Sequence, residues 1–516
     1  MTDDCGPLSA RHGGLITLAA STAIAYFTLF PFDFHVPADA TMLGTITNFD
    51  VTVAAKWIVV DLALNILLFI PFGFGVTALL SRQPTGHLGL VTGGALAGVV
   101  FSLVMEFIQG YALSRFPSLI DVVANGLGAL LGSLAYVRSG RSITTWCSGV
   151  ARRVGSSITL PRLLAASALW LVAFVLFTAW AGNTTRLRNW DPSYPLIVGN
   201  ELTGNRPWDG VIKSLFILDR SVDDDTARRL IEDGASPLDG TSTSLVVHHD
   251  FTRNEAGFPP LEWQGDDPME ISAAGVRVGT LGWLRSPGAV SEVSARLQET
   301  SEFTIGVTVA TSDVDQGGPA RIASISDGTM TRNLTLGQED GDLVIRMRTP
   351  LMGPHGSSPA LVVPDVFVDE STHDLLVRYD GSTIQVDIDD DARTRVLELA
   401  PETATLISVF PDEVGSLRVG VTDNWGVRVA FRALALLPLC VVGAGWYRQR
   451  PTGGTARALG VGGGLGVLAV GFDAALTAVI DAYDFRMGMV LLNLLVLAVG
   501  FVGAVLVMRL AGDPRQ

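Results

Sequence analysis

Runs of apolar residues constrain this chain more than any other feature, because a helix needs about 20 such residues to span a membrane. The sequence holds eight runs of this kind, at roughly 14–32, 57–80, 88–110, 118–137, 162–181, 427–447, 457–479 and 487–509. The first run continues past Ala23-Ile24-Ala25, which resembles a cleavage site, so an uncleaved helix is favoured over a signal peptide. The sequence therefore predicts a membrane protein with eight spanning helices.

The charged residues predict how these helices are oriented. Arginines lie in the loops at 81–87, 138–161 and 448–456 and in the C-terminal tail, whereas the alternate loops are acidic or nearly uncharged. Cytoplasmic loops carry the excess of Lys and Arg in multi-pass proteins. We therefore expect both termini in the cytoplasm and residues 182–426 outside it.

This orientation divides the chain into five segments. We expect, in order, a four-span helical module at 1–137, a basic cytoplasmic loop at 138–161, a fifth span at 162–181, an extracytoplasmic domain at 182–426, and a three-span module with a short cytoplasmic tail at 427–516. The net charge of −15 argues against a nucleic-acid partner, which would require a basic surface.

In the extracytoplasmic segment the spacing of apolar residues changes to a period of two. Apolar and polar residues alternate at 303–309, 343–347, 384–388 and 417–421, with Asp-Gly turn signals between such runs. Many short strands of this kind predict an all-β sandwich or jelly roll. All three cysteines lie outside this segment, so we expect its core to hold it together without a disulfide; they are Cys5, Cys147 and Cys440.

Three stretches of this segment resemble concanavalin A-like, LamG-type jelly rolls. They are DGVIKSLFILDRSVDDDTARRL at 209–230, LVVHHDFT at 245–252 and HDLLVRYDGSTIQVDID at 373–389. The first stretch usually closes such domains, but here it comes first. We therefore infer a permuted sandwich in which the strand after Trp208 lies beside the strand near Leu417.

The resemblance implies a lectin or a glycan hydrolase. Hydrolysis would need two carboxylates bracketing a glycosidic bond, and the Glu-x-Asp-x-(x)-Glu motif of glucanases is missing from the sequence. The irregular acids Glu262, Asp266, Asp267 and Glu270 fit a solvated acidic loop better.

Glycan binding would instead use exposed aromatic side chains. The candidates are Trp208, Trp263, Trp283 and Tyr379, with core packing as the alternative role for each. We expect no cofactor, although the acidic runs at 223–225 and 389–391 can supply oxygen ligands to calcium.

The second, third and fourth spans carry polar residues on shared helix faces. These are Asp61 and Asn65 on the second span, Ser102, Glu106 and Gln109 on the third, and Ser118, Asp121 and Asn125 on the fourth, with Arg115 just before it. A central charge in a span costs roughly 2.5–3.5 kcal/mol on insertion scales. The three acids are therefore expected to face one another and the arginine rather than lipid.

These residues also carry a family resemblance. The chain contains Asn-x-x-x-Phe-x-Pro-x-Gly from residue 65, Ser-x-x-x-Glu-x-x-Gln from residue 102 and Arg-x-x-Ser-x-x-Asp-x-x-x-Asn from residue 115. Residues 20–137 thus resemble the VanZ-like family. The founding member of this family is associated with resistance to a glycopeptide antibiotic, which implies a role in the cell envelope.

The predicted orientation places this polar pocket in the outer leaflet. In one interpretation it binds a lipid headgroup or a glycolipid: Arg115 pairs an anionic group, Glu106 and Asp121 orient it or move protons, and Asn65 and Gln109 form hydrogen bonds with it. In the other, the polar residues only hold the helices together.

Small residues and a proline support both interpretations. Pro71 and Gly73 are expected to bend the second span and free backbone groups. Close approach of the helices is expected at Gly94, Gly98, Gly126, Gly128 and Gly132. In the later spans, Asp473 and Asn493 are expected to be packing or hydrogen-bonding residues.

The sequence thus predicts an envelope protein that engages lipid or glycolipid through its helices and glycan through its β domain. Two alternatives stay open. One is a membrane enzyme acting on lipid-linked sugars with Glu106 or Asp121 as general base, although the sequence has no nucleophile, hydrolase or transferase signature. The other is a transporter, although no inverted repeat indicates one. The sequence sets no oligomeric state.

Overall fold

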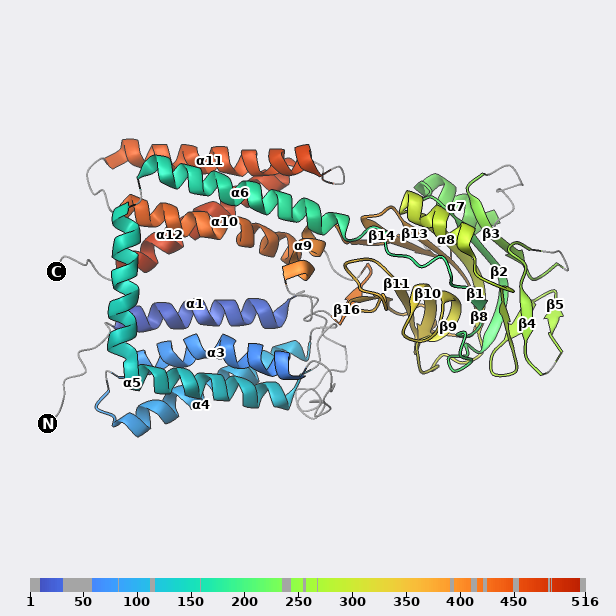
Figure 1. Cartoon of the computed structure of the whole chain (residues 1–516), viewed down its shortest axis with the longest axis horizontal. Helices are drawn as coiled ribbons and strands as arrows, with labels where there is room; N and C mark the ends of the chain where they lie inside the picture. Colours follow the sequence, from blue (N-terminus) through green and yellow to red (C-terminus); the bar gives the residue numbers. More distant parts are fainter. Residues whose placement is uncertain are drawn as a thin grey trace. The chain divides into compact units, whose positions relative to one another are not determined.

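The chain forms two compact units in the computed structural model (Figure 1). One is helical and comprises Met1–Val175, Gly426–Ala478 and Asp484–Gln516, and the other is rich in strands and comprises Leu176–Trp425 and Val479–Tyr483. The structure describes residues 10–30, 58–81, 83–111, 117–157, 159–233, 243–253, 257–266, 268–389, 394–409, 415–420, 425–448, 454–480, 483 and 485–510.

Long apolar helices make up the first unit. They are α1 (Ala10–Leu29), α3 (Ile58–Leu80), α4 (His87–Gln109), α5 (Leu119–Ser157), α6 (Leu160–Asn183), α10 (Trp425–Arg448), α11 (Gly454–Val479) and α12 (Met487–Leu510). Among the described residues, six are long and apolar enough to cross a membrane, namely stretches of α3, α4, α5, α6, α10 and α12. The runs predicted at 14–32 and 457–479 fall on α1 and α11, whose apolar stretches among the described residues are Gly13–Leu29 and Gly466–Val479.

The segment predicted as a cytoplasmic loop at 138–161 differs from the expectation. Helix α5 continues to Ser157, and α6 begins at Leu160. No proline occurs between Leu119 and Pro161, so nothing in the sequence forces the helix to end where its apolar part ends.

Helices α3 and α5 run parallel and touch through their backbones. A Cβ added to Gly73 would lie 2.0 Å from the carbonyl oxygen of Ala129, and a Cβ on Gly132 would lie 2.0 Å from the carbonyl oxygen of Ile70. At Gly128 the corresponding distance to a backbone oxygen is 2.3 Å. Glycine is therefore required at these three positions, as predicted for Gly128 and Gly132 but not for Gly73.

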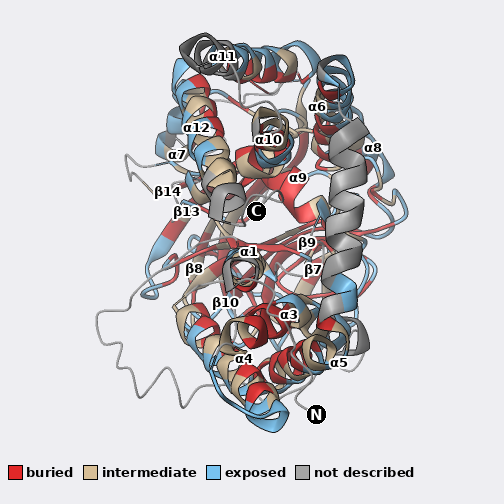
Figure 2. Ribbon diagram, turned by 90° about the vertical axis from the view of Figure 1, so that its left-hand side faces the viewer, coloured by how far each residue is buried: buried red, intermediate tan, exposed pale blue. Residues whose placement is uncertain are grey.

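Helix α4 packs against this pair through its own glycines. A Cβ on Gly94 would lie 2.3 Å from the hydroxyl oxygens of Thr77 and Ser133, and one on Gly98 would lie 2.2 Å from the Cβ of Ala129. On α5, a Cβ on Gly126 would approach a Val99 methyl to 2.8 Å. Figure 2 shows buried positions where the three helices meet.

The remaining helices of this unit meet through aromatic rings. The Phe174 ring of α6 lies 5.3 Å from the Phe431 ring of α10 and 6.1 Å from the Phe472 ring of α11. The Trp170 indole donates a hydrogen bond to the carbonyl oxygen of Ala435 at 2.8 Å.

Among the described residues, the second unit contains two sheets of eight strands each. In spatial order, the first sheet contains β16 (Ser416–Arg418), β12 (Ala360–Val363), β11 (Asp342–Met347), β10 (Arg332–Glu339), β9 (Ala320–Ser326), β1 (Leu196–Val198), β7 (Trp283–Arg285) and β4 (Glu262–Gln264). The second contains β15 (Arg395–Glu398), β14 (Thr383–Ile388), β13 (Thr372–Tyr379), β8 (Phe303–Thr311), β2 (Gly210–Leu218), β6 (Gly275–Val278) and β5 (Ile271–Ser272), with β3 (Leu245–Asp250) beside β2.

Neighbouring strands are antiparallel except β12 and β16, which are parallel. Three short helices complete the unit, α7 (Asp224–Asp233), α8 (Ser291–Thr300) and α9 (Glu402–Val409). Apolar side chains line up across strands; in the second sheet Leu215 is opposite Val307, which is opposite Leu375. All three are buried. The predicted alternation at 303–309, 343–347 and 384–388 therefore corresponds to strands of a β-sandwich.

The predicted pairing of the strand after Trp208 with the strand near Leu417 is wrong. Strand β2 lies in the second sheet and pairs with β8, β3 and β6, whereas β16 lies in the first sheet beside β12. The nine residues of β2 are mostly buried and suit a central strand, whereas the three residues of β16 suit an edge.

We expect Gly132→Ala to destabilise the helical unit by about 1–3 kcal/mol, because the new methyl group would meet the backbone of α3. The matched control is Gly89→Ala on α4, where a Cβ would meet only a Thr85 carbon at 3.7 Å. Thermal unfolding of the detergent-solubilised chain measures both. Equal midpoints for the two variants would contradict close α3–α5 packing.

His249 gives the sandwich a predicted pH dependence. The ring lies on β3, is 5% exposed and stacks on Phe251 with a centroid distance of 5.5 Å. Burial, with a smaller effect of the neighbouring His248, lowers the His249 pKa to about 4. The unfolded chain therefore binds more protons between that value and the ordinary pKa of about 6.5. Stability is lost as the pH falls through this window.

We expect this loss to reach about 3 kcal/mol at pH 4 in the wild-type protein. The variant His249→Leu fills the same buried position with an apolar side chain and removes the titrating group. The sandwich unfolding midpoint, followed by circular dichroism of the full chain, should therefore fall less steeply below pH 6.5 in the variant. Parallel pH profiles for the two proteins would show that another group is responsible.

Candidate functional site

The polar residues predicted on three spans converge at one end of the α3–α4–α5 bundle. Asn65 Nδ2 of α3 donates to Asp121 Oδ1 of α5 at 3.1 Å, and Asn125 Nδ2 of α5 donates to Ser102 Oγ of α4 at 2.9 Å. Ser102 and Asn125 are buried, at 0% and 2% exposure. The structure thus joins all three predicted faces by hydrogen bonds.

Glu106 holds the beginning of α5. Its Oε2 atom accepts a hydrogen bond from the backbone N–H of Ser118 at 2.8 Å, and the side chain is 3% exposed. Asp121 lies in the first turn of the same helix, where carboxylates interact favourably with the positive end of the helix dipole. The two acids therefore have a structural role that a sequence pattern alone does not show.

Gln109 connects the cluster to α1. Its Nε2 atom donates to the backbone carbonyl of Thr28 at 2.8 Å. Its Oε1 atom is buried and has no hydrogen-bond partner among the described residues, and the same holds for Oδ1 of Asn125. Buried amide oxygens without a donor are unfavourable, and more so in a membrane, where water does not compensate. We call the residues Asn65, Ser102, Glu106, Gln109, Ser118, Asp121 and Asn125 the bundle-end cluster.

Two predicted members of the pocket cannot be placed. Arg115 lies outside the described residues, and Asp61 is described only as a backbone position in α3. Helix α3 continues through Pro71 to Leu80, so the proline removes a backbone donor without ending the helix. The bend at Pro71 and Gly73 stays a prediction.

A second polar ladder lies farther along α3 and α5. Thr77 Oγ1 donates to Ser133 Oγ at 2.8 Å and is also 2.8 Å from the carbonyl oxygen of Gly73. Ser81 Oγ lies 2.9 Å from the hydroxyl of Tyr136. Sequence reasoning missed this ladder, although Asn65–Asp121 and Thr77–Ser133 share a spacing of 56 residues.

Two of the four aromatic glycan-binding candidates are core residues. Trp208 is 0% exposed and its indole donates to Gln338 Oε1 at 2.8 Å. Tyr379 is also 0% exposed, and its hydroxyl donates to the carbonyl oxygen of Thr185 at 2.6 Å. Neither ring is accessible for stacking on a sugar, so burial removes both from the candidates.

The other two candidates, Trp263 and Trp283, are partly exposed on adjacent strands β4 and β7. Trp263 is paired with Leu284, and therefore Trp283 projects from the opposite face of the sheet. Trp283 lies against Gly204, and its buried indole Nε1 has no acceptor in the described part of the chain. The pair does not form one continuous aromatic platform.

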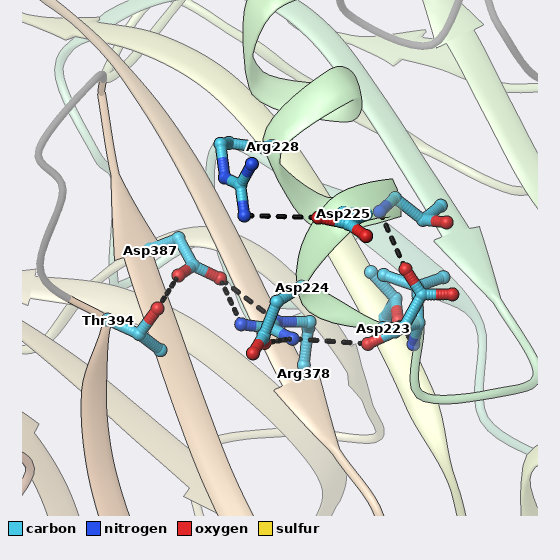
Figure 3. Close-up of polar contacts among 10 residues, drawn as sticks. Asp223, Asp224, Asp225, Arg228, Arg378, Asp387 and Thr394 are labelled. Carbon is cyan, nitrogen blue, oxygen red and sulfur yellow. Dashed lines mark hydrogen bonds and ion pairs between the residues drawn. The ribbon is translucent and has the colours of Figure 1, made fainter.

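The three aspartates of the 223–225 run have separate protein partners (Figure 3). Asp223 Oδ1 accepts from the backbone N–H of Thr226 at the start of α7, Asp224 pairs with Arg378 and Asp225 pairs with Arg228. The hydrogen bonds to Asp223 hold its pKa below the ordinary range.

The other acidic candidates lie apart from any cluster. Asp389 accepts from His373 Nδ1 at 2.9 Å, and residues 390 and 391 lie outside the described residues. Glu262, Asp266 and Glu270 are exposed, as expected of an acidic surface, whereas Asp267 is not described. No group of three or more His, Cys, Asp or Glu that could hold a metal ion occurs among the described residues.

The later helices contain a buried charged pair. Arg432 Nη2 of α10 lies 3.9 Å from Asp473 Oδ1 of α11, and both side chains are 0% exposed. Asn493 Nδ2 of α12 donates to Asp473 Oδ2 at 2.6 Å. The predicted hydrogen-bonding role of Asp473 and Asn493 is therefore found in the structure. The contribution of Arg432 was missed, because it lies only seven residues inside its helix and looks like a flanking charge.

We expect Asp473→Leu to destabilise the helical unit by about 3–5 kcal/mol, because it leaves the Arg432 guanidinium buried without this carboxylate. The double variant Asp473→Leu with Arg432→Met should recover most of that loss. Thermal unfolding in detergent measures both proteins. A double variant as unstable as the single one would show that the two residues act independently.

Comparison with known proteins bears on the helical unit. No curated protein and no solved structure matches the chain. The VanZ/LLP1 family model matches residues 17–140, which contain all members of the bundle-end cluster. The resemblance predicted for residues 20–137 is thus supported: residues 17–140 of this membrane protein are similar to the VanZ/LLP1 family.

Proposed function

We propose that this membrane protein works in the cell envelope, where the bundle-end cluster binds the polar headgroup of a lipid or glycolipid and the sandwich binds glycan. The VanZ-like domain supports the envelope role. The observation that carries the headgroup proposal is the pair of buried, unpaired amide oxygens at Gln109 and Asn125.

The chemistry of the cluster favours a ligand rich in hydrogen-bond donors. The two amide oxygens accept hydrogen bonds, and Glu106 and Asp121 add carboxylate oxygens nearby. Hydroxyl and ammonium groups of a headgroup would supply the missing donors. Arg115, the first residue of the third family motif, would pair with an anionic group of the same ligand.

The second polar ladder provides an internal comparison. Thr77 and Ser133 satisfy one another and nearby carbonyl oxygens, and neither hydroxyl is unpaired. This is what residues that only hold helices together should look like. The bundle-end cluster differs because its hydrogen bonding is incomplete.

The distribution of arginines supports the proposal that the headgroup site and the glycan-binding sandwich face the same side of the membrane. Residues 182–426 are expected outside the cytoplasm, and α3, α4 and α5 place the cluster at the ends expected to face the same side. A headgroup in the outer leaflet and a glycan outside the membrane would then be met by one protein.

Reconstitution into nanodiscs tests the headgroup proposal. The full chain is placed in phosphatidylethanolamine discs with a few per cent of phosphatidylglycerol or a diglucosyl lipid, and retained lipid is counted by native mass spectrometry. We expect Glu106→Gln and Asp121→Asn to reduce retention of one added lipid about tenfold. Each substitution keeps an acceptor oxygen at its position, so the thermal midpoint should change little.

Thr77→Val is the matched control from the second polar ladder. It should lower the thermal midpoint but leave lipid retention unchanged. Equal lipid retention in the wild type and in both cluster variants would leave the bundle-end cluster with a packing role alone.

A further inference from the structure

Three arginines lie on neighbouring central strands of the first sheet, and we call them the arginine cluster. Arg321 is on β9, Arg332 on β10 and Arg346 on β11. Arg321 and Arg332 are each 1% exposed, and Arg346 is partly buried. Arginine is almost never fully buried unless it is paired, so the cluster needs an explanation.

Strand pairing places hydroxyl groups beside these arginines. Arg346 lies directly opposite Thr335, and Thr335 lies opposite Ser324. Arg332 lies opposite Ser326. Residues directly opposite one another project from the same face of a sheet, so guanidinium and hydroxyl groups share this face.

One buried carboxylate partly balances the charge. Glu201, in the loop after β1, is 0% exposed and accepts a hydrogen bond from Ser326. Its Oε2 atom lies 3.5 Å from Arg321 Nε, which is an ion pair without a hydrogen bond. Arg332 and Arg346 make no ion pair with a carboxylate anywhere in the part of the chain that the structure describes.

Donor atoms of the cluster point to a missing partner. Nε and Nη1 of Arg332, Nε of Arg346 and the hydroxyl of Thr335 are buried without a hydrogen-bond partner among the described residues. Buried polar groups in proteins are otherwise paired in the great majority of cases. These donors, lying on adjacent strands, require acceptor oxygens.

The electrostatics favour a negative partner. Burial is the main cause that lowers the pKa of Arg321 to about 9 and that of Arg332 to about 10. Neighbouring arginines, Arg346 among them, lower both pKa values further, and the charge of Glu201 only partly opposes this. The groups remain protonated at neutral pH, so they repel one another in a poorly solvated place. An anion would relieve both the repulsion and the loss of solvation.

A buried arginine on the second sheet shows the contrasting arrangement. Arg378 is also 1% exposed, but its Nε lies 2.9 Å from Asp387 Oδ2 and its Nη1 lies 2.7 Å from Asp224 Oδ1 (Figure 3). Its Nη1 also donates to the carbonyl oxygen of Val222 at 3.1 Å. A structural arginine in this fold therefore has carboxylates bonded to it, whereas Arg332 is only influenced by the charge of Glu201 and makes no ion pair with it among the described residues.

We propose that the arginine cluster is a binding site for an oxyanion, namely a carboxylate, phosphate or sulfate carried by an envelope saccharide. A planar guanidinium binds the two oxygens of such a group side by side. The oxyanion chemistry stands on the cluster alone, and the saccharide carrier rests on the proposed glycan binding by the sandwich.

The same face of the sheet offers a contact for a sugar ring. Ser324 lies opposite Ile197, and Ile197 lies opposite Arg285. Trp283 is two residues before Arg285 on β7 and therefore shares this face. It is partly exposed and has an unpaired indole N–H. An aromatic ring near basic groups is the combination that an acidic sugar would use.

Titration calorimetry on the full chain in detergent tests the site. The probes are inorganic phosphate, sulfate, acetate and glucuronate. Glucose is the uncharged control, and added chloride salt keeps the ionic strength constant. We expect at least one oxyanion to bind and to raise the sandwich unfolding midpoint. Arg332→Met should weaken that binding at least about tenfold. Its ligand-free midpoint should be unchanged or higher, since an unpaired buried charge is removed.

Two further variants keep the result interpretable. Thr335→Val removes one unpaired hydroxyl with little change in volume, so it should weaken binding without unfolding the sandwich. Arg378→Met should lower the midpoint, because Asp387 and Asp224 lose their partner, and yet leave oxyanion binding intact in the folded fraction. This pattern separates a ligand site from a structural arginine.

The outcomes test the oxyanion site and its saccharide carrier separately. Glucuronate binding more tightly than acetate supports a carboxylated saccharide, and preference for phosphate or sulfate supports a carrier with that group. Glucose binding without oxyanion binding overturns the anion site but not glycan binding. If the oxyanions bind but no member of a panel of envelope glycans binds, the saccharide carrier is overturned. Oxyanion binding unchanged by Arg332→Met, or no binding at all, overturns the site.

Discussion

The backbone contact between α3 and α5 is the constraint on which the helical unit depends. Lipid tails are as apolar as leucine, so membrane helices associate through close packing and hydrogen bonds rather than through a hydrophobic driving force. Gly73 and Gly132 let carbonyl oxygens of one helix approach the α-carbons of the other. That approach brings Asn65 within hydrogen-bonding distance of Asp121. The bundle-end cluster is thus a consequence of glycine placement as much as of the polar residues themselves.

Much of this unit could be predicted because membrane helices follow strong local rules. Apolar runs mark the helices, and a polar group within such a run must find a partner, so contacts such as Asn65–Asp121 and Asn125–Ser102 could be expected between these helices. The facing of the three acids and Arg115 stays a prediction. The Thr77–Ser133 pair was not expected, because a hydroxyl in an apolar run can bond its own helix and carries no signal of its neighbour. The Arg432–Asp473 pair joins two helices whose contact no sequence periodicity specifies.

The sandwich was predictable as strands but not as an arrangement of strands. Alternation reveals which face of a strand is buried, yet it does not identify the neighbouring strand, so β2 was assigned to the wrong partner. The sequence also left open whether its aromatic residues lie on the surface or in the core. Trp208 and Tyr379 are core residues, because Gln338 and the Thr185 carbonyl accept their donors in the interior. Arginines at alternate strand positions look like a solvated face, and no local pattern reveals that Arg332 is covered.

The bundle-end cluster and the arginine cluster leave opposite kinds of polar atoms unpaired, and this difference separates their chemistry. In the bundle-end cluster the unpaired atoms are the amide oxygens of Gln109 and Asn125, which need donors. In the first sheet they are mainly guanidinium nitrogens, which need acceptors. A fold selected for stability alone would replace or pair such groups, as it does around Arg378. Incomplete pairing of opposite polarity in these two clusters is what motivates both binding proposals, and the proposed saccharide, with hydroxyls and an acidic group, would carry donors and acceptors of both kinds.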